Sequence, residues 1–144
     1  MGETGCICFG PELEVAAREI MDRRAREIEG RKAEDHVGRW LKRRGWKILA
    51  TRFKVAQGEV DIIARRKTVI AFIEVKQRKK LPETEDLLTQ SNITRVMDAA
   101  EVWVDRNFSD LGPDFEIRFD LAMIEGRVHP LAKVQYLENA FSGF

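Results

Sequence analysis

The stretches GEVDIIA at residues 58–64 and VIAFIEVK at residues 69–76 decide the fold of this chain. Both stretches are rich in Val, Ile and Phe, the composition typical of β-strands. The polar residues 65–68 between them have the length of an ordinary hairpin loop. We therefore predict a β-hairpin over residues 58–76, and the rest of the chain is interpreted around it.

The register of this hairpin determines which side chains share a face. If Ala64 pairs with Val69, Asp61 lies opposite Phe72, and alternation along the strands places mainly charged side chains on one face. An odd-numbered loop would flip one arm and scatter the charges. The expected charged face carries Glu59, Asp61, Phe72, Glu74 and Lys76, and the expected apolar face carries Val60, Ile62, Ile73 and Val75.

The charged face has the composition of a metal site. Carboxylates that interrupt an apolar, central strand are unfavourable unless a cation compensates them. Asp61 and Glu74 offer the hard oxygen ligands that Mg²⁺ and Mn²⁺ prefer. Lys76 would orient a metal-activated water or stabilise charge on a phosphate. A solvated sheet face also carries Glu and Lys, but charged clusters on buried strands favour the functional interpretation.

Composition restricts the class of protein. A chain of 144 residues with 44% hydrophobic content forms one compact unit. The formal net charge of +1 gives no overall basic field, so nucleic-acid binding would have to use local patches. No apolar run approaches the roughly 20 residues of a membrane span, and no signal-peptide pattern opens the chain. We expect a cytoplasmic protein without membrane contact.

Cysteines and histidines do not suggest a zinc site. Cys6 and Cys8 are the only cysteines, and a lone C-x-C pair cannot complete a four-ligand site, so we expect a reduced tail. His36 and His129 have no second His or Cys at ligand spacing. We predict that they are ordinary surface or partly buried residues.

Two amphipathic helical patterns precede the hairpin, over residues 11–29 and 31–44. Gly30 is expected to break or bend the chain between them, and Gly45 to end the second helix. Glu34 lies at the edge of the second apolar stripe, from which it could reach the charged hairpin face; a solvated flanking Glu is the alternative. The end of this helix is the densest basic patch of the chain: Arg39, Lys42, Arg43, Arg44 and Lys47.

The remaining elements complete an α+β pattern. A strand at residues 46–53 precedes the hairpin, and residues 77–80 carry positive charge directly after Lys76. Residues 81–86 form either a polar connection or an irregular entry to a helix, which Ser91 would cap and in whose apolar stripe Trp103 packs. Two further strands are expected at residues 116–124 and 133–137.

Five sequence blocks in this order resemble the motifs of the bacterial YraN family, from Gly30 to Phe144. They are GRKAE at residues 30–34, GEVDII at 58–63, IEVKQR at 73–78, RFD at 118–120 and NAF at 139–141. The resemblance implies a restriction-endonuclease-like fold with a mixed β-sheet flanked by helices and an α-β-β-β-α-β order. This fold is similar to that of archaeal Holliday junction resolvases and PD-(D/E)xK nucleases.

The resemblance also implies site roles. Residues matching Asp61 and Glu74 bind the metal in such nucleases, the match of Lys76 assists the water, and a helix carboxylate matching Glu34 completes the site. We accordingly expect Mg²⁺ or Mn²⁺ held by these carboxylates and the backbone carbonyl of Val75, with no small-molecule cofactor. The expected nucleic-acid-binding residues are Gln77, Arg78, Lys79, Arg31, Arg39 and Asn92.

Two hypotheses follow. The first is a metal-dependent nuclease acting on DNA, with branched and single-stranded DNA among its candidate substrates. The second is a nucleic-acid-binding or protein-interaction module that keeps the fold and an idle site. Asn92 stands where family members usually carry Lys, which favours the second. Residues 1–29 lie outside the resemblance, so we expect a tail with an accessory helix there and an endonuclease-like domain over residues 30–144.

Overall fold

The computed structural model describes residues 10–81 and 84–142, so the expectations for Cys6 and Cys8 and for residues 82–83 lie outside the described residues. The fold is α+β, as predicted, with a five-stranded mixed sheet. The elements are α1 (Pro11–Arg43), β1 (Lys47–Val55), β2 (Gly58–Arg66), β3 (Val69–Arg78), α2 (Thr84–Leu87), α3 (Gln90–Leu111), β4 (Glu116–Glu125) and β5 (Val134–Leu137).

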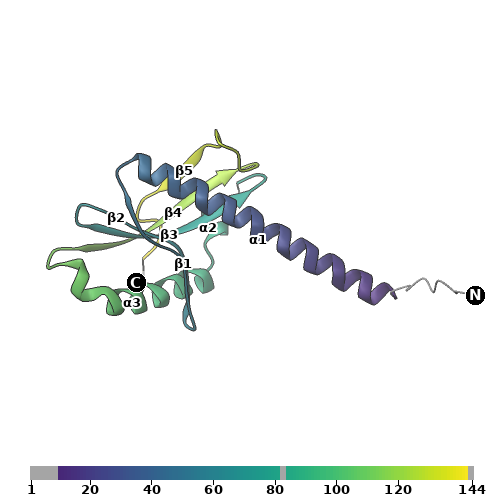
Figure 1. Cartoon of the computed structure of the whole chain (residues 1–144), viewed down its shortest axis with the longest axis horizontal. Coiled ribbons are helices and arrows are strands. Elements are labelled where there is room, and N and C mark those ends of the chain that lie inside the picture. Colours follow the sequence, from purple (N-terminus) through teal and green to yellow (C-terminus); the bar gives the residue numbers. More distant parts are fainter. Residues whose placement is uncertain (1–9, 82–83, 143–144) are drawn as a thin grey trace, which may run out of the picture.

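The strands lie in the sheet in chain order, from β1 to β5 (Figure 1). The pairs β1–β2, β2–β3 and β4–β5 are antiparallel. Strands β3 and β4 are parallel because α3 returns the chain to the end of the sheet at which β3 begins. The predicted core order is therefore present, with the short α2 and the edge strand β5 added.

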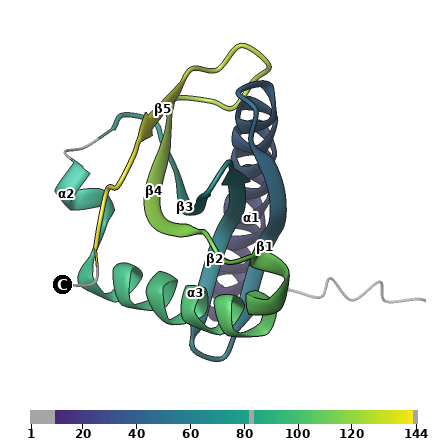
Figure 2. The same ribbon diagram turned by 90° about the vertical axis from the view of Figure 1, so that its left-hand side faces the viewer.

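Helices α1 and α3 cover opposite faces of the sheet (Figure 2). On the α1 side, Ala33, Val37 and Leu41 pack against sheet residues that include Ile62 and Ile73. On the α3 side, α3 residues such as Val96 and Trp103 pack against Val60, Ile63, Ile70 and Phe72. The ring centroids of Trp103 and Phe72 lie 5.8 Å apart, so the predicted packing role of Trp103 is confirmed.

Helix α1 is a single helix of 33 residues, and the predicted break at Gly30 is wrong. A glycine inside a helix costs about 1 kcal/mol relative to alanine, which weakens a helix without forcing it to end. The described part before residue 29 is exposed throughout and projects beyond the sheet (Figure 1). The predicted stop is confirmed, because α1 ends at Arg43 and Gly45 takes the left-handed φ of +85°.

The hairpin has a two-residue turn, so the predicted register is wrong by two residues. Arg66 pairs with Val69, and Phe72 lies opposite Ile63 instead of Asp61. Arg65 and Arg66 were assigned to the loop because they are polar, yet polar residues pair readily at the end of a strand. A shift of two preserves the alternation, so Asp61 and Glu74 still belong to matching positions.

The predicted division into a charged and an apolar face is only partly correct. Phe72 is fully buried in the α3-side core and does not belong to the charged group. Val60 packs with that same core, whereas Ile62, Ile73 and Val75 pack on the α1 side. The pairing of β2 with β3 ends at Ile62 and Ile73. The regular alternation of side chains between the two faces of the sheet also ends there, next to Asp61.

Two smaller findings concern helices. The N-cap of α3 is Thr89, whose hydroxyl accepts a hydrogen bond from the backbone of Asn92, so the prediction of Ser91 as the cap is wrong. Ser91 lies inside the first turn. Within residues 10–81 and 84–142, no helix combines the length and the apolar character that crossing a bilayer requires.

Candidate functional site

The candidate site lies where β2 and β3 separate. Their ladder ends at the pair Ile62–Ile73, whereas β3 continues to pair with β4 as far as Arg78. The separation leaves backbone groups on one edge of β3 without a strand partner. Asp61 fills one of these positions, since its Oδ2 accepts a hydrogen bond of 2.8 Å from the Val75 N–H. The carboxylate is thereby fixed next to β3.

An open groove of about 1190 Å³ surrounds this separation. Its wall is formed by the middle of α1, by Asp61 on β2, by the end of β3 and by the loop after β4. The structure places in it all four residues predicted to be catalytic: Glu34, Asp61, Glu74 and Lys76.

Glu74 and Lys76 form a close pair in the groove. Glu74 Oε1 lies 3.1 Å from Lys76 Nζ, and both side chains are largely buried. Burial raises the pKa of Glu74 to about 7; the Asp61 charge adds to the increase and Lys76 opposes it. Burial also raises the pKa of Asp61, against the opposing effects of the Val75 hydrogen bond and the Lys76 charge. Lys76 alone therefore leaves the two carboxylates undercompensated.

Glu34 approaches from α1 and is paired with a residue that the sequence did not reveal. Arg52 Nε on β1 lies 2.6 Å from Glu34 Oε2. This oxygen is buried, yet within the described chain it accepts no hydrogen bond of acceptable geometry, so the contact is an ion pair without hydrogen-bond alignment. Burial raises the pKa of Glu34 to about 7, the Asp61 charge adds to this, and Arg52 opposes it.

Arg52 occupies an unusual position. Its φ of 50° is in the left-handed region, inside strand β1, where a residue with a side chain is strained. Its guanidinium also lies 3.4 Å from Asp35 Oδ1 and 3.5 Å from the Arg31 carbonyl oxygen. The register of β1 against β2, had it been known, would have revealed that Arg52 lies beside the groove. Residue 52 falls between the pairs Thr51–Ile62 and Phe53–Val60, opposite Asp61.

The donor chemistry of the groove fits a hard divalent cation. Glu34, Asp61 and Glu74 line it together with the more exposed Glu29, and the buried Glu34 Oε2 has no hydrogen bond. In the part of the chain that the structure describes, however, no three acidic, histidine or cysteine side chains already stand in a coordinating arrangement. Asp61 and Glu74 are engaged by the Val75 N–H and by Lys76. Binding of an ion would therefore require these side chains to rearrange.

The predicted nucleic-acid-binding residues divide into two groups. Gln77, Arg78 and Lys79 line the groove. Arg31 and Arg39 are exposed on α1, Asn92 lies in the first turn of α3, and none of these three is part of the groove wall. The wall also includes three charged residues that were not among the predicted site residues: Arg26, Glu29 and Arg127. The first two lie in the part of α1 that was predicted to be an accessory helix outside the site.

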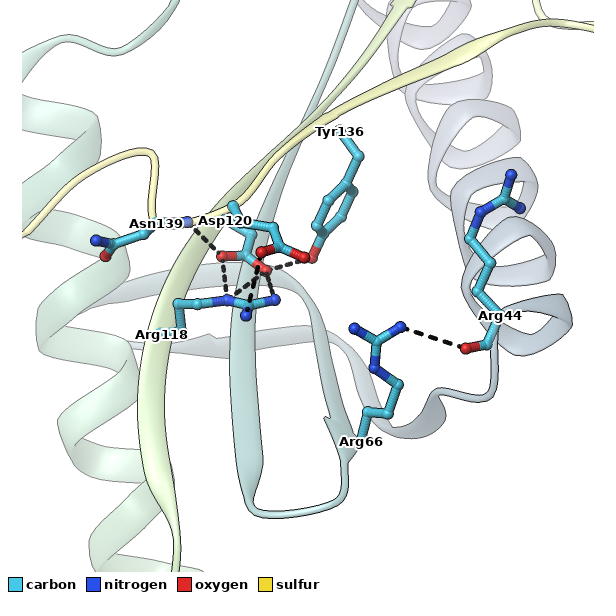
Figure 3. A network of polar contacts seen from close by, with 7 residues as sticks. Arg44, Arg66, Arg118, Asp120, Tyr136 and Asn139 are labelled. Carbon is cyan, nitrogen blue, oxygen red and sulfur yellow. Dashed lines mark hydrogen bonds and ion pairs between the residues drawn. The ribbon is translucent and has the colours of Figure 1, made fainter.

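A second acidic centre lies elsewhere in the sheet (Figure 3). Asp120 is fully buried, and its carboxylate accepts hydrogen bonds from the Arg118 guanidinium, the Tyr136 hydroxyl and the Asn139 backbone N–H. These contacts connect β4 to β5 and to the segment after it. The RFD and NAF blocks thus supply a structural network, and Asp120 retains no capacity for a ligand.

His36 also has a structural role. It is buried, at 2% exposure, and its Nε2 lies 2.7 Å from the Ala132 carbonyl oxygen, which connects α1 to the segment between β4 and β5. His129 lies in that segment, where its Nδ1 accepts a hydrogen bond from the Leu131 N–H. Neither histidine lines the groove.

Comparison with known proteins identifies the family. The family model described as uncharacterised protein family UPF0102 matches residues 33–124. This chain belongs to UPF0102. A UPF0102 protein of Rhodopseudomonas palustris (strain HaA2) is 38% identical over 123 residues, covering 83% of this chain and 89% of the relative. A UPF0102 protein of Bradyrhizobium diazoefficiens is 37% identical over 121 residues, covering 84% and 87%.

A UPF0102 protein of Sphingopyxis alaskensis is 38% identical over 110 residues, covering 76% of this chain and 92% of the relative. The YraN family that the sequence blocks resemble is UPF0102, so that prediction is confirmed. The UPF0102 match begins at Ala33 and includes Glu34, Asp61, Glu74 and Lys76. The exposed first half of α1 lies outside it.

Proposed function

We propose that this UPF0102 protein is a metal-dependent phosphodiesterase that acts on DNA, with the groove as its active site. The observation that supports the proposal is the convergence of three partly buried carboxylates and Lys76 on one open groove. Asp61 and Glu74 would hold Mg²⁺ or Mn²⁺, and Glu34 would contribute directly or through a water. A bound ion supplies Lewis-acid stabilisation of a phosphate oxygen and activation of a water.

The residues around the carboxylates have separate tasks. The Val75 N–H fixes the orientation of Asp61 through its 2.8 Å hydrogen bond. The Lys76 ammonium, which lies beside Glu74, faces the groove and would stabilise charge that develops on a phosphate. Arg78, Lys79 and Arg127 would bind the phosphates that flank the reacting one. In this proposal, the cations of the groove bind the substrate and the neighbouring carboxylates bind the metal.

The second candidate is a module that binds nucleic acid or protein without cleaving. The observation that favours it is the absence, among the described residues, of a ligand set already arranged for coordination. Asn92 in place of the usual family Lys favours it as well.

A cleavage assay separates the two candidates. Purified protein would be incubated with linear, flapped and four-way DNA in Mg²⁺ or Mn²⁺. The wild type should cleave at least one substrate, and Lys76→Ala should lower the rate constant roughly 10²- to 10⁴-fold while metal binding persists. Arg106→Ala, which removes a positive charge from α3 outside the groove, is the control and should cleave normally. Cleavage that is equally fast in Lys76→Ala would reject the assignment of the active site.

A further inference from the structure

The chain contains a long basic segment that the overall charge conceals. Residues 36–58 include seven Lys and Arg residues and no Asp or Glu, although the whole chain has a formal net charge of only +1. This segment covers the end of α1, all of β1 and the turn that leads into β2. A local positive surface therefore exists outside the groove.

Several of these residues are brought together with the tip of the β2–β3 hairpin. Lys47 pairs with Arg65 across β1 and β2, and Arg66 Nη1 lies 3.4 Å from the Arg44 carbonyl oxygen (Figure 3). Lys67 follows in the turn of the hairpin. We name this surface the basic corner; it consists of Lys42, Arg43, Arg44, Lys47, Arg66 and Lys67.

The charges of the basic corner are not neutralised by the protein. Among the residues that the structure describes, none of the six side chains forms an ion pair with a carboxylate. Six like charges on adjoining elements repel one another, and an external polyanion would relieve that repulsion.

Aromatic rings hold two of the guanidinium groups in place. The Arg44 guanidinium lies 3.9 Å from the centroid of the Trp40 ring, which in turn stacks on Tyr136 at 5.1 Å. The Arg66 guanidinium lies 4.7 Å from the centroid of the Trp46 ring. Each guanidinium uses its Nη1 to donate to a backbone carbonyl, and stacking leaves its other donors available. Because stacking also restricts the side chain, less entropy is lost when a phosphate binds.

We propose that the basic corner binds the phosphate backbone of a nucleic acid, at a place separate from the groove. A lipid surface fits less well, because the exposed large apolar side chains among the described residues lie outside the basic corner and none is available there for insertion. The binding does not depend on catalysis in the groove.

The distance between the two surfaces suits one continuous strand or duplex. Twelve helical residues separate Gly30 from Lys42, or about 18 Å. Five strand residues separate Asp61 from Arg66, or about 17 Å. At roughly 3.4 Å per base pair, this corresponds to about five base pairs. A DNA held at the basic corner therefore reaches the groove within about half a helical turn.

The test measures binding without cleavage. Full-length protein in EDTA would be titrated by fluorescence anisotropy against a labelled linear duplex of about two helical turns, roughly 20 base pairs, over a series of salt concentrations. Lys42→Gln combined with Arg43→Gln should raise Kd roughly tenfold at low salt and lower the slope of log Kobs against log salt by about 2. Lys67→Gln, from a different element, should lower the slope by about 1.

The control is the pair Arg23→Gln and Arg24→Gln, which removes the same charge from exposed positions in the projecting part of the same helix. It should leave the slope unchanged. Equal losses for both pairs, an unchanged slope for the corner variants, or binding to phosphatidylserine vesicles without binding to DNA would overturn the proposal. Corner-dependent binding by a protein that never cleaves DNA in Mn²⁺ would support the basic corner and reject the proposed active site.

Discussion

Asp120 and the carboxylates of the groove are two acidic centres in one sheet, and they differ in how far their buried oxygens are compensated by hydrogen bonds and positive charges. Asp120 is fully buried and accepts hydrogen bonds from a guanidinium, a hydroxyl and a backbone N–H. In the groove, burial raises the pKa of both Glu34 and Glu74 to about 7. One buried Glu34 oxygen accepts no hydrogen bond within the described chain.

The difference separates a structural acid from carboxylates that, in the proposed function, would bind a ligand. A carboxylate whose lone pairs are all used stabilises the fold and cannot bind anything else. Carboxylates that are crowded and undercompensated reduce the stability of the free protein, and that energy is recovered when a cation binds. Substitutions in the two centres should therefore change stability in opposite directions.

The largest effect is expected at Asp120. Asp120→Asn removes the charge that Arg118 requires and should lower the free energy of unfolding by about 3–5 kcal/mol, because the largely buried Arg118 keeps only the exposed carboxylate of Glu138 nearby. Urea unfolding followed by circular dichroism would measure this.

The matched control is Glu138→Gln, which removes the other carboxylate near Arg118, at 3.6 Å and on an exposed side chain. Its effect should stay within about 0.5 kcal/mol. Similar effects of the two substitutions would contradict the structural role assigned to Asp120.

The second effect is a pH dependence in the groove. Burial raises the pKa of Glu74 in the folded protein to about 7, above the usual value of 4.5 for a glutamate. Between these values the unfolded chain releases the proton while the folded protein keeps it, so the metal-free protein loses stability as pH rises from about 4.5 to 7. Glu74→Gln does not titrate, and its stability relative to wild type should rise by about 2–3 kcal/mol over that window.

Denaturant unfolding of both proteins in EDTA, from about pH 4.5 to 8, would measure this difference. A stability difference that stays constant across the series would show that burial does not perturb Glu74.

The third effect concerns metal binding. Asp61→Asn should weaken the binding of Mn²⁺ at least roughly tenfold, or ~1.4 kcal/mol, because it removes a charged ligand from the centre of the site. Isothermal titration calorimetry would measure it. Asp35→Asn removes the same charge from an exposed side chain beside Glu34 and should change the affinity much less. Calorimetry without binding heat for the wild type, even with DNA present, would reject the metal site.

The smallest effect is expected at Arg52. If its cation competes with a metal for Glu34, Arg52→Gln should tighten Mn²⁺ binding by roughly two- to fivefold, since a partly exposed charge of the same sign is removed. Lys54→Gln, two residues further along β1, is the control and should leave the affinity unchanged. Weaker binding in Arg52→Gln would show that Arg52 instead holds Glu34 in its binding position.

Much of the fold could be predicted from the sequence, because period-2 and helical patterns are clear in most elements. The β2–β3 hairpin and strand β4 were expected close to their observed bounds, and the helix α3 was expected to begin near its observed start. The break at Gly30 was not observed, because glycine weakens a helix without ending it. The hairpin register was wrong by two because Arg65 and Arg66 pair as strand residues although they look like a loop.

The composition of the groove could be predicted only in part. Asp61, Glu74 and Lys76 come together because an even shift of register leaves the alternation intact, and their catalytic roles stay predictions. Arg52 could not be found, since its position depends on the pairing of β1 with β2 and on the irregularity between Ile48 and Ala50. A lone arginine in a strand carries no local signal of such a contact.

The hydrogen bond between the Val75 N–H and Asp61 provides a natural spectroscopic probe. In a regular ladder this amide would donate to a carbonyl, whose charge does not change with pH or with ligands. Here it donates to a carboxylate at 2.8 Å. The ¹⁵N and ¹H chemical shifts of Val75 should therefore follow the charge of Asp61 directly. One backbone resonance would thus report the protonation of Asp61, and the binding of a cation to it, without any substitution in the groove.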